Sequence, residues 1–375
     1  GKNVTMTVDG VGTTIRPGRY GGKVVLTITD DIPVKYKELS HVYKAALYVN
    51  DGKRVDGKSV LAAVTGGSSD DSAARNIRIT SNEDRFNGVY VSGKSKYTID
   101  GLTIRLNGIG GNDFAGYGAA LMADGNADVT INKADILNRG AVRPAVFIGG
   151  NAVVHINDSR IETFPGSLPQ DYKFNVDLGR MFEPPWMLGL SGNVRATNLV
   201  ASGTVYYDRS HIITHGWGAL SVDDPVRTRM FVTDSTVDAI GAGYCTYAIG
   251  DSHNTFSHSI CNAADYGAIT GGEASLTITD GSVFRSGRYG VMLHTGVGGG
   301  TITIDKGSTL AAGLTAIQAK GRGTTVVIDN ATVTAGNGIL VQAMANDDPF
   351  MKRMMAGPPP GGPPGGGAGG PPGGS

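Results

Sequence analysis

Short apolar strands alternate with polar turns along most of the chain, and one such pattern returns at nearly constant spacing. Each copy has an apolar Ile or its equivalent, then Asn, Asp or Thr, one variable residue, a small residue and another apolar position. The clearest copies are TINKADI at 130–136, HINDSRI at 155–161, TITDGSV at 277–283, TIDKGST at 303–309 and VIDNATV at 327–333. Neighbouring copies are 25 residues apart at Ile131 and Ile156, 26 at Ile278 and Ile304, and 24 at Ile304 and Ile328. A period in the twenties is typical of a solenoid.

A second short apolar motif follows each first one and ends in a glycine or polar turn. Its copies lie at 87–93, 118–125, 144–150, 186–192, 218–224, 246–252, 267–273, 290–296, 315–321 and 338–344. Each repeat therefore predicts at least two strands and two turns. One repeat cannot bury its apolar side chains alone, but stacked repeats pair strands at about 4.8 Å and share one core. The Asn, Asp or Thr after each Ile is expected at a recurring turn, where it can hydrogen-bond the backbone and its neighbours in the column.

This repeat pattern resembles the right-handed parallel β-helix superfamily, whose shape is that of pectate lyases, polygalacturonases and many secreted bacterial proteins. The resemblance covers roughly residues 74–345 and implies an all-β fold, a right-handed parallel β-helix solenoid of about ten coils. Residues 1–73 alternate like strands and are expected to form an N-terminal β cap, because the end of a solenoid must be covered. The Pro/Gly-rich residues 346–375 are expected to form a flexible spacer or anchor, with a packed polyglycine-like helix as the alternative.

Composition supports many strands and excludes some partners. Gly accounts for 58 of 375 residues, while Lys plus Arg and Asp plus Glu are equal at 33 each, so no overall field would attract nucleic acid or an anionic membrane. No apolar run is long enough for a membrane span, and the N-terminus lacks the features of a signal peptide. We nevertheless expect a secreted or cell-surface protein whose signal has been removed. Cys245 and Cys261 could form a disulfide, but their different places in the coil argue mildly against it.

The repeat is broken at residues 162–186, a stretch too long for a coil turn and rich in aromatic side chains. We expect it to fold over either a ligand or the coil itself. The next coil, 204–229, concentrates side chains able to transfer protons or bind carboxylates. The predicted catalytic set is His215, Tyr207, Arg227, Arg229 and Asp224.

In a polysaccharide lyase, His215 or Tyr207 would remove the proton beside a uronate carboxylate, and Arg227 and Arg229 would hold that carboxylate. Asp224 has a plainer interpretation, as a turn residue before Pro225. The resemblance to polygalacturonases does not extend to their Asp and His-Gly arrangement. No cofactor or metal is expected, and calcium held by aspartates is unsupported by any motif.

A candidate binding surface follows from aligning the second strands. Trp217, Tyr244, Tyr266 and Tyr289 then fall in one column, with steps of 27, 22 and 23 residues. Stacked rings can simply stabilise the solenoid, or their faces can form a platform for sugar rings. The full predicted substrate-binding set is Trp186, Trp217, Tyr244, Tyr266, Tyr289 and His294.

Three functions remain open from the sequence. The leading hypothesis is an exported carbohydrate-active enzyme, a lyase rather than a glycoside hydrolase, with a polysaccharide or another small molecule as its ligand. The second is a non-enzymatic surface or adhesin-like module that binds or serves as a spacer. The third is an enzyme acting on a small aromatic or other non-sugar molecule. The oligomeric state is not predicted.

Overall fold

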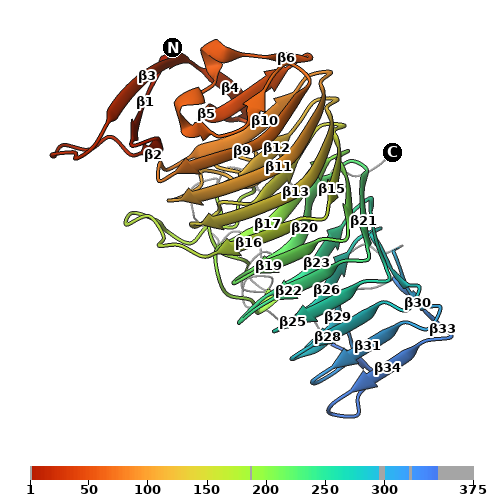
Figure 1. Cartoon of the computed structure of the whole chain (residues 1–375). Helices are drawn as coiled ribbons and strands as arrows, with labels where there is room; N and C mark the ends of the chain where they lie inside the picture. The colour runs from red at the N-terminus through yellow and green to blue at the C-terminus, as the bar shows by residue number, and fades with distance from the viewer. Residues whose placement is uncertain (1, 186–187, 295–299, 321–322, 345–375) are drawn as a thin grey trace.

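The protein is a parallel β-solenoid of about ten coils whose strands stack along one axis (Figure 1). The computed structural model describes residues 2–185, 188–294, 300–320 and 323–344. Within these residues the regular structure is almost entirely β, with two single-turn 3-10 helices, η1 (Asp56–Lys58) and η2 (Leu61–Ala63). None of the helices in the described part of the chain is long and apolar enough to cross a membrane. The predicted all-β parallel solenoid of about ten coils is confirmed.

One wall of the solenoid is a 13-stranded sheet, named sheet I here. Its strands are β4 (Ile32–Tyr36), β5 (Leu39–Asn50), β6 (Lys53–Arg54), β10 (Phe86–Ser92), β12 (Leu121–Ala123), β14 (Val146–Ile148), β17 (Arg195–Ala201), β20 (Gly218–Pro225), β23 (Tyr244–Ile249), β26 (Tyr266–Gly271), β29 (Tyr289–Leu293), β32 (Ile317–Ala319) and β35 (Val341–Ala343). β6 pairs antiparallel with β5, and every other strand from β5 to β35 pairs in parallel with its counterpart in the next coil.

The other walls belong to a 22-stranded sheet, named sheet II, which bends once in every coil. Before the bend lie β15 (Val153–Asn157), β18 (Thr204–Asp208), β21 (Thr228–Thr233), β24 (Ser252–Ser257), β27 (Ser275–Thr279), β30 (Thr301–Asp305) and β33 (Thr325–Asp329). After it lie β16 (Arg160–Phe164), β19 (His211–Thr214), β22 (Thr236–Ala239), β25 (Ile260–Ala263), β28 (Val283–Ser286), β31 (Thr309–Ala312) and β34 (Thr332–Ala335). The longer β11 (Lys96–Asn107) and β13 (Asp128–Arg139) continue through the bend, and β9 (Ala73–Ser81) pairs with β11.

The strand register reproduces the repeat read from the sequence. Ile131 lies opposite Ile156, and Ile278 opposite Ile304, which in turn lies opposite Ile328. The first four of these side chains are completely buried, so the recurring Ile is an inward-facing core position. The period of the motif is therefore the length of one coil.

The bend in sheet II explains the rest of the motif. The variable residue adopts a left-handed backbone, with φ between 46° and 51° at Asp158, Arg209, Asp234 and His258. The small residue that follows is usually a serine, whose backbone N–H donates to the serine Oγ of the next coil at 3.0–3.2 Å. This serine ladder runs through Ser159, Ser210, Ser235, Ser259 and Ser282. One position earlier in the motif, the side-chain amide of Asn157 donates to Oδ1 of Asn132 in the preceding coil at 3.0 Å, which is the column contact expected from the sequence.

The N-terminal residues form small antiparallel units beside the first coils. β1 (Lys2–Val8) pairs with both β2 (Val11–Thr13) and β3 (Val24–Asp30), and β7 (Val64–Thr65) and β8 (Ser68–Ser69) pair with β9. β4 pairs antiparallel with β5, which then runs parallel to β10 and so joins the stack. The tail predicted to be flexible, residues 346–375, lies outside the described residues.

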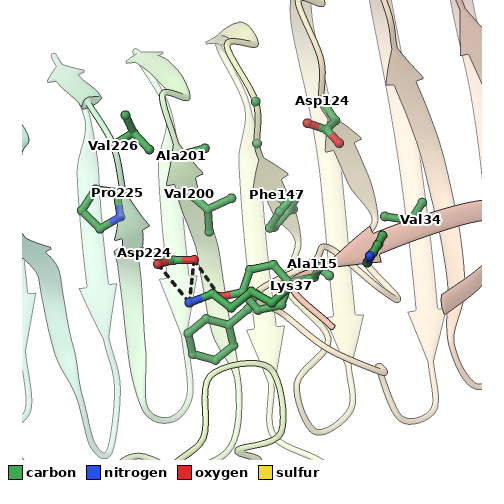
Figure 2. Close-up of a pocket in the computed structure, with 15 residues that line it drawn as sticks. Val34, Lys37, Ala115, Asp124, Phe147, Val200, Ala201, Asp224, Pro225 and Val226 are labelled. Atoms are coloured by element: carbon green, nitrogen blue, oxygen red, sulfur yellow. Dashed lines mark hydrogen bonds and ion pairs between the residues drawn. The ribbon is translucent and has the colours of Figure 1, made fainter. Parts of the chain in front are cut away.

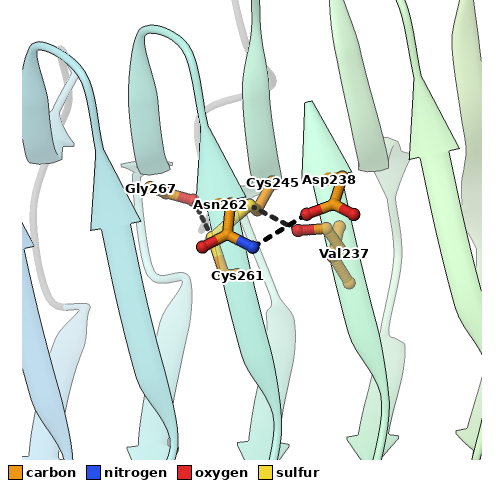
Figure 3. Close-up of a disulfide and its surroundings, with 6 residues drawn as sticks. All are labelled: Val237, Asp238, Cys245, Cys261, Asn262 and Gly267. Carbon is orange, nitrogen blue, oxygen red and sulfur yellow. Dashed lines mark hydrogen bonds between the residues drawn. A yellow bond between two sulfur atoms is a disulfide. The ribbon is translucent and has the colours of Figure 1, made fainter. Parts of the chain in front are cut away.

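A disulfide joins Cys245 and Cys261, whose Cα atoms are 6.0 Å apart (Figure 3). The expectation that their sulfurs need not meet was wrong. Cys245 lies on β23 of sheet I and Cys261 on β25 of sheet II, so they occupy different parts of the coil. Both side chains point into the interior and are fully buried, and the two walls are close enough there for the sulfurs to bond.

Candidate functional site

The outer face of sheet I is partly covered by loops that interrupt the regular coils. Phe114, from the segment between β11 and β12, and Met181 and Leu188, from the long insertion after β16, belong to one buried cluster with Trp217 and Tyr244. The described part of the insertion thus packs on coil side chains through Met181, one of the two roles expected for residues 162–186. This cover decides which of the predicted binding residues are accessible.

The predicted aromatic column is largely a buried packing element. Tyr244 lies opposite Tyr266, and Tyr266 lies opposite Tyr289. Gly218, not Trp217, stands opposite Tyr244, so the alignment of Trp217 was wrong by one residue. Trp217, Tyr244 and Tyr266 are buried, and their ring faces do not form an open platform. Of the other predicted binding residues, His294 is also buried, and Trp186 lies outside the described residues.

The structure does not bring the predicted catalytic residues together. Tyr207 is buried inside the coil, where its hydroxyl lies 2.6 Å from the Thr197 hydroxyl and burial raises its pKa above the usual value. His215 lies on the outside of sheet II, with its Nε2 2.9 Å from Glu162 Oε1 and its ring stacked on Phe164.

The two predicted carboxylate-binding arginines, Arg227 and Arg229, lie apart from both Tyr207 and His215. Arg229 pairs with Asp251 at 3.2 Å, and Arg227 approaches the same carboxylate at 4.0 Å, at the turn after β23. Asp224 is at the end of β20 and faces a pocket on sheet I. A base and its carboxylate-binding arginines are thus not assembled by this geometry.

That pocket is a candidate site on the outer face of sheet I, with a volume of about 330 Å³. It lies between the turn that joins β4 to β5 and the ends of β14, β17 and β20. Figure 2 shows Asp224 and Lys37 toward one end, Asp124 toward the other, and Phe147 and Val200 between them. The remaining lining residues are Val34, Lys35, Tyr36, Phe114, Ala115, Gly149, Gly150, Ala201, Pro225 and Val226.

Asp224 organises one end of the pocket. It accepts hydrogen bonds from the Tyr36 hydroxyl at 3.1 Å and from Lys37 Nζ at 3.3 Å. Burial, and then the charge of Asp224, raise the pKa of Tyr36 far above its usual value. The phenol therefore stays protonated and acts as a hydrogen-bond donor, not as a base.

Asp124 supplies a second carboxylate at the other end. Its Oδ1 accepts the N–H of Gly125 at 2.7 Å, and burial raises its pKa above the usual range. It forms no ion pair with the described residues in this geometry. A carboxylate of this kind can accept hydrogen bonds from a bound molecule.

A buried group of charges supports the pocket from the side. Arg195 Nε donates to Asp113 at 3.0 Å, and Arg195 also pairs with Asp223. The guanidinium lies between the rings of Phe114, at 4.8 Å, and Trp217, at 4.5 Å. These contacts fasten the loop carrying Asp113 to β17 and β20, and so fix one wall of the pocket.

Burial and the charges of neighbouring groups both shift the pKa values in this cluster. Burial raises the pKa of Asp113, against the opposing effect of Arg195. Burial alone would lower the pKa of Arg195, but the charges of Asp113 and Asp223 outweigh it and raise that pKa. Asp223 faces this cluster and Asp224 faces the pocket, both on the outer face of sheet I, because a bulge in β20 and a left-handed backbone at Asp224, with φ of 47°, interrupt the strand alternation.

Most of the pocket was missed by sequence reasoning. Tyr36 and Lys37 come from the N-terminal segment, Asp113 from a loop, and Arg195 from the start of β17, and none of them lies in a repeated motif. Asp124 had a signal, because it ends one copy of the second motif at a turn. Among the described residues, no group of three or more His, Cys, Asp or Glu side chains could hold a metal ion.

Comparisons with known proteins add no family. No protein-family model matches the chain, and neither a curated protein nor a solved structure does. The likeness to pectate lyases and polygalacturonases therefore extends to a parallel solenoid of β coils and no further.

Proposed function

We propose that the protein binds a carbohydrate in the pocket on sheet I and does not cleave it. The observation that carries this proposal is the combination of an apolar floor, Phe147 and Val200, with carboxylates at both ends, Asp124 and Asp224. Sugars present apolar C–H surfaces together with several hydroxyl donors, and such pockets bind them by apolar contact and a few directed hydrogen bonds. Tyr36 adds a protonated donor at the same end as Asp224.

The geometry favours binding over the lyase that the sequence suggested. A lyase needs a base with its pKa near the working pH, and Tyr36, the pocket's phenol, has its pKa raised instead. His215, Arg227 and Arg229 do not line the pocket and pair instead with Glu162 and Asp251. The lyase stays the alternative, and one experiment can distinguish the two.

The test is calorimetric titration of neutral, amino-sugar and uronate oligosaccharides, with absorbance of unsaturated sugar ends followed in parallel. We expect saturable binding of at least one class without new absorbance. Asp124→Asn and Asp224→Asn should each weaken it about tenfold, the effect of losing one hydrogen bond to a charged group. Asp234→Asn, at an exposed bend of sheet II, is the matched control and should bind normally. Absence of binding to every class rejects the proposal, and new absorbance supports the lyase.

We also propose that the protein works in an oxidising compartment, at the cell surface or outside the cell. The support is the buried disulfide between Cys245 and Cys261, because disulfides form and persist mainly in such compartments. Thiol labelling of protein taken from its native cells tests this. The two cysteines should be unreactive until a denaturant and a reductant are added together, and labelling without the reductant would contradict the proposal.

A further inference from the structure

The N-terminal ribbon leaves one strand edge open. β3 pairs with β1, and none of the other described strands pairs with its opposite edge. The ribbon projects from the N-terminal end of the stack (Figure 1). An open edge presents unpaired backbone N–H and C=O groups that can pair with another strand.

The same strand exposes an apolar stripe. Leu26 is 62% exposed and Ile28 65%, and Val24 and Val4 beside them are also exposed. Val4 lies opposite Ile28 in the β1–β3 ladder, so these side chains share one face of the ribbon. Single exposed apolar residues are ordinary on protein surfaces, whereas a contiguous stripe along an open strand edge indicates an interface.

β3 also lacks the features that usually protect an edge. Its seven residues, VVLTITD, include no proline and only one charge, Asp30 at the end. Edge strands are normally blocked by proline, a bulge, a central charge or short length.

We propose that β3 pairs antiparallel with β3 of a second copy of this chain, about a two-fold axis at Leu26. In this register Leu26 lies opposite its own counterpart, and Val24 lies opposite Ile28 of the second copy. All three exposed apolar positions then meet apolar partners on one face, and the ribbons of the two copies, each made of β2, β1 and β3, form one continuous sheet. Such a contact is isologous, since each copy contributes the same surface.

The charges at the two ends of β3 fit this arrangement. Lys23 precedes the strand, and Asp30 and Asp31 end it. In this register Lys23 of each copy lies opposite Thr29 of the other, at the end of the strand that carries the aspartates, whereas parallel pairing would place like charges together. The strand is therefore complementary to itself, which favours a second copy over an unrelated partner.

The contact is small, because seven residues from each copy bury less than the roughly 1,200–2,000 Å² of a standard interface. We therefore expect a dimer that dissociates on dilution. Sedimentation velocity of the full chain from low to high micromolar concentration should show a reversible shift from monomer to dimer. Leu26→Lys places two like charges on the axis and should weaken association at least tenfold. Ile240→Lys, at an exposed apolar position on another part of the solenoid, should leave it unchanged.

Cysteine crosslinking tests the register. The two native cysteines are bonded to each other, so an introduced cysteine is the only free thiol among the described residues. Under mild oxidation, Leu26→Cys should crosslink to itself, and a mixture of Val24→Cys and Ile28→Cys chains should crosslink more than either chain alone. Circular dichroism checks that each variant is folded. A monomer at every concentration, or crosslinking no greater than that of Ile240→Cys, overturns the proposal.

Discussion

The bend of sheet II and the outer face of sheet I are built in opposite ways. At the bend, each coil repeats one set of bonds, the left-handed residue and the serine that bonds the next coil. On the outer face of sheet I, the contacts join segments that occur once. Asp113 comes from a loop, Arg195 from β17 and Tyr36 from β4.

The difference teaches how a solenoid combines stability with a site. Repeated bonds can be lost singly because neighbouring coils keep their own copies, so each contributes modestly. Contacts made once have no copy to replace them, and they are the ones that shape the pocket. Both regions contain an arginine paired with two aspartates, which allows a direct comparison.

The largest expected effect is that of Arg195→Ala. The side chain of Arg195 is only 2% exposed, and its removal would leave Asp113 and Asp223 close together without a cation. Loss of one partner from a buried ion pair costs about 3–5 kcal/mol. The matched variant is Arg209→Ala at the bend, where Arg209 pairs with Asp158 and Asp208 but is 54% exposed. We expect little measurable change there, because solvent screens the pairs. Urea unfolding measures both, and equal losses would contradict the contrast between the two regions.

Next in size is the loss of the disulfide that ties sheet I to sheet II. The cysteines are 16 residues apart, and closing a loop of this length stabilises a protein by about 3 kcal/mol in the chain-entropy model. The double variant Cys245→Ala/Cys261→Ala should lose this amount in urea unfolding. A reductant should lower the stability of the original protein to a similar extent and leave that of the double variant unchanged. A reductant effect on both would show that it acts elsewhere.

The same contrast separates what could be predicted from the sequence. The coil was predictable because stacking places similar residues above one another in successive coils, so the buried Ile columns appear in the sequence as a repeat of constant length. The period could also have placed Tyr207 inside, since it lies opposite Ile156 and Val232, two core positions. The phenol of Tyr207 could in principle act as a base, but the position of Tyr207 in a column of core residues determines that it is buried.

The pocket was not predictable in this way. Tyr36 and Asp224 are 188 residues apart in the sequence and meet because the end of β4 lies over the outer face of later strands of sheet I. Nothing periodic connects them, and the length of a loop does not reveal where it will pack. The disulfide was missed for a related reason, because position along the coil gives no measure of the distance between facing walls.

A smaller effect is expected from one rung of the serine ladder. Ser210 Oγ accepts the N–H of Ser159 at 3.1 Å and donates to the Asp208 carbonyl at 2.9 Å. Ser210→Ala leaves that buried N–H without its acceptor and should cost about 1–3 kcal/mol. Ser275→Ala is the control, because the one partner of the Ser275 hydroxyl among the described residues is the half-exposed His253 side chain. If Ser210→Ala lowers the free energy of unfolding as much as Arg195→Ala does, then neighbouring coils do not compensate for the loss of one repeated hydrogen bond.

The smallest expected effect depends on pH and concerns Glu162, on the outer face of sheet II. Partial burial would raise its pKa, but hydrogen bonds from Arg160 and His215 outweigh burial and hold the pKa below its usual range. A carboxyl whose pKa is lowered on folding stabilises the protein above its unfolded pKa, about 4.3 for Glu, and loses that contribution as the pH falls through the folded value. Glu162→Gln should therefore reduce the stability at pH 6 by less than about 1 kcal/mol, which is seen as a lower melting temperature. Plots of melting temperature against pH for the variant and the original protein should converge below pH 4. Arg160→Met removes one of the two donors and should show part of the same convergence. If the plots of melting temperature against pH stay parallel down to pH 3, these hydrogen bonds on the outer face of sheet II do not contribute to the stability of the fold.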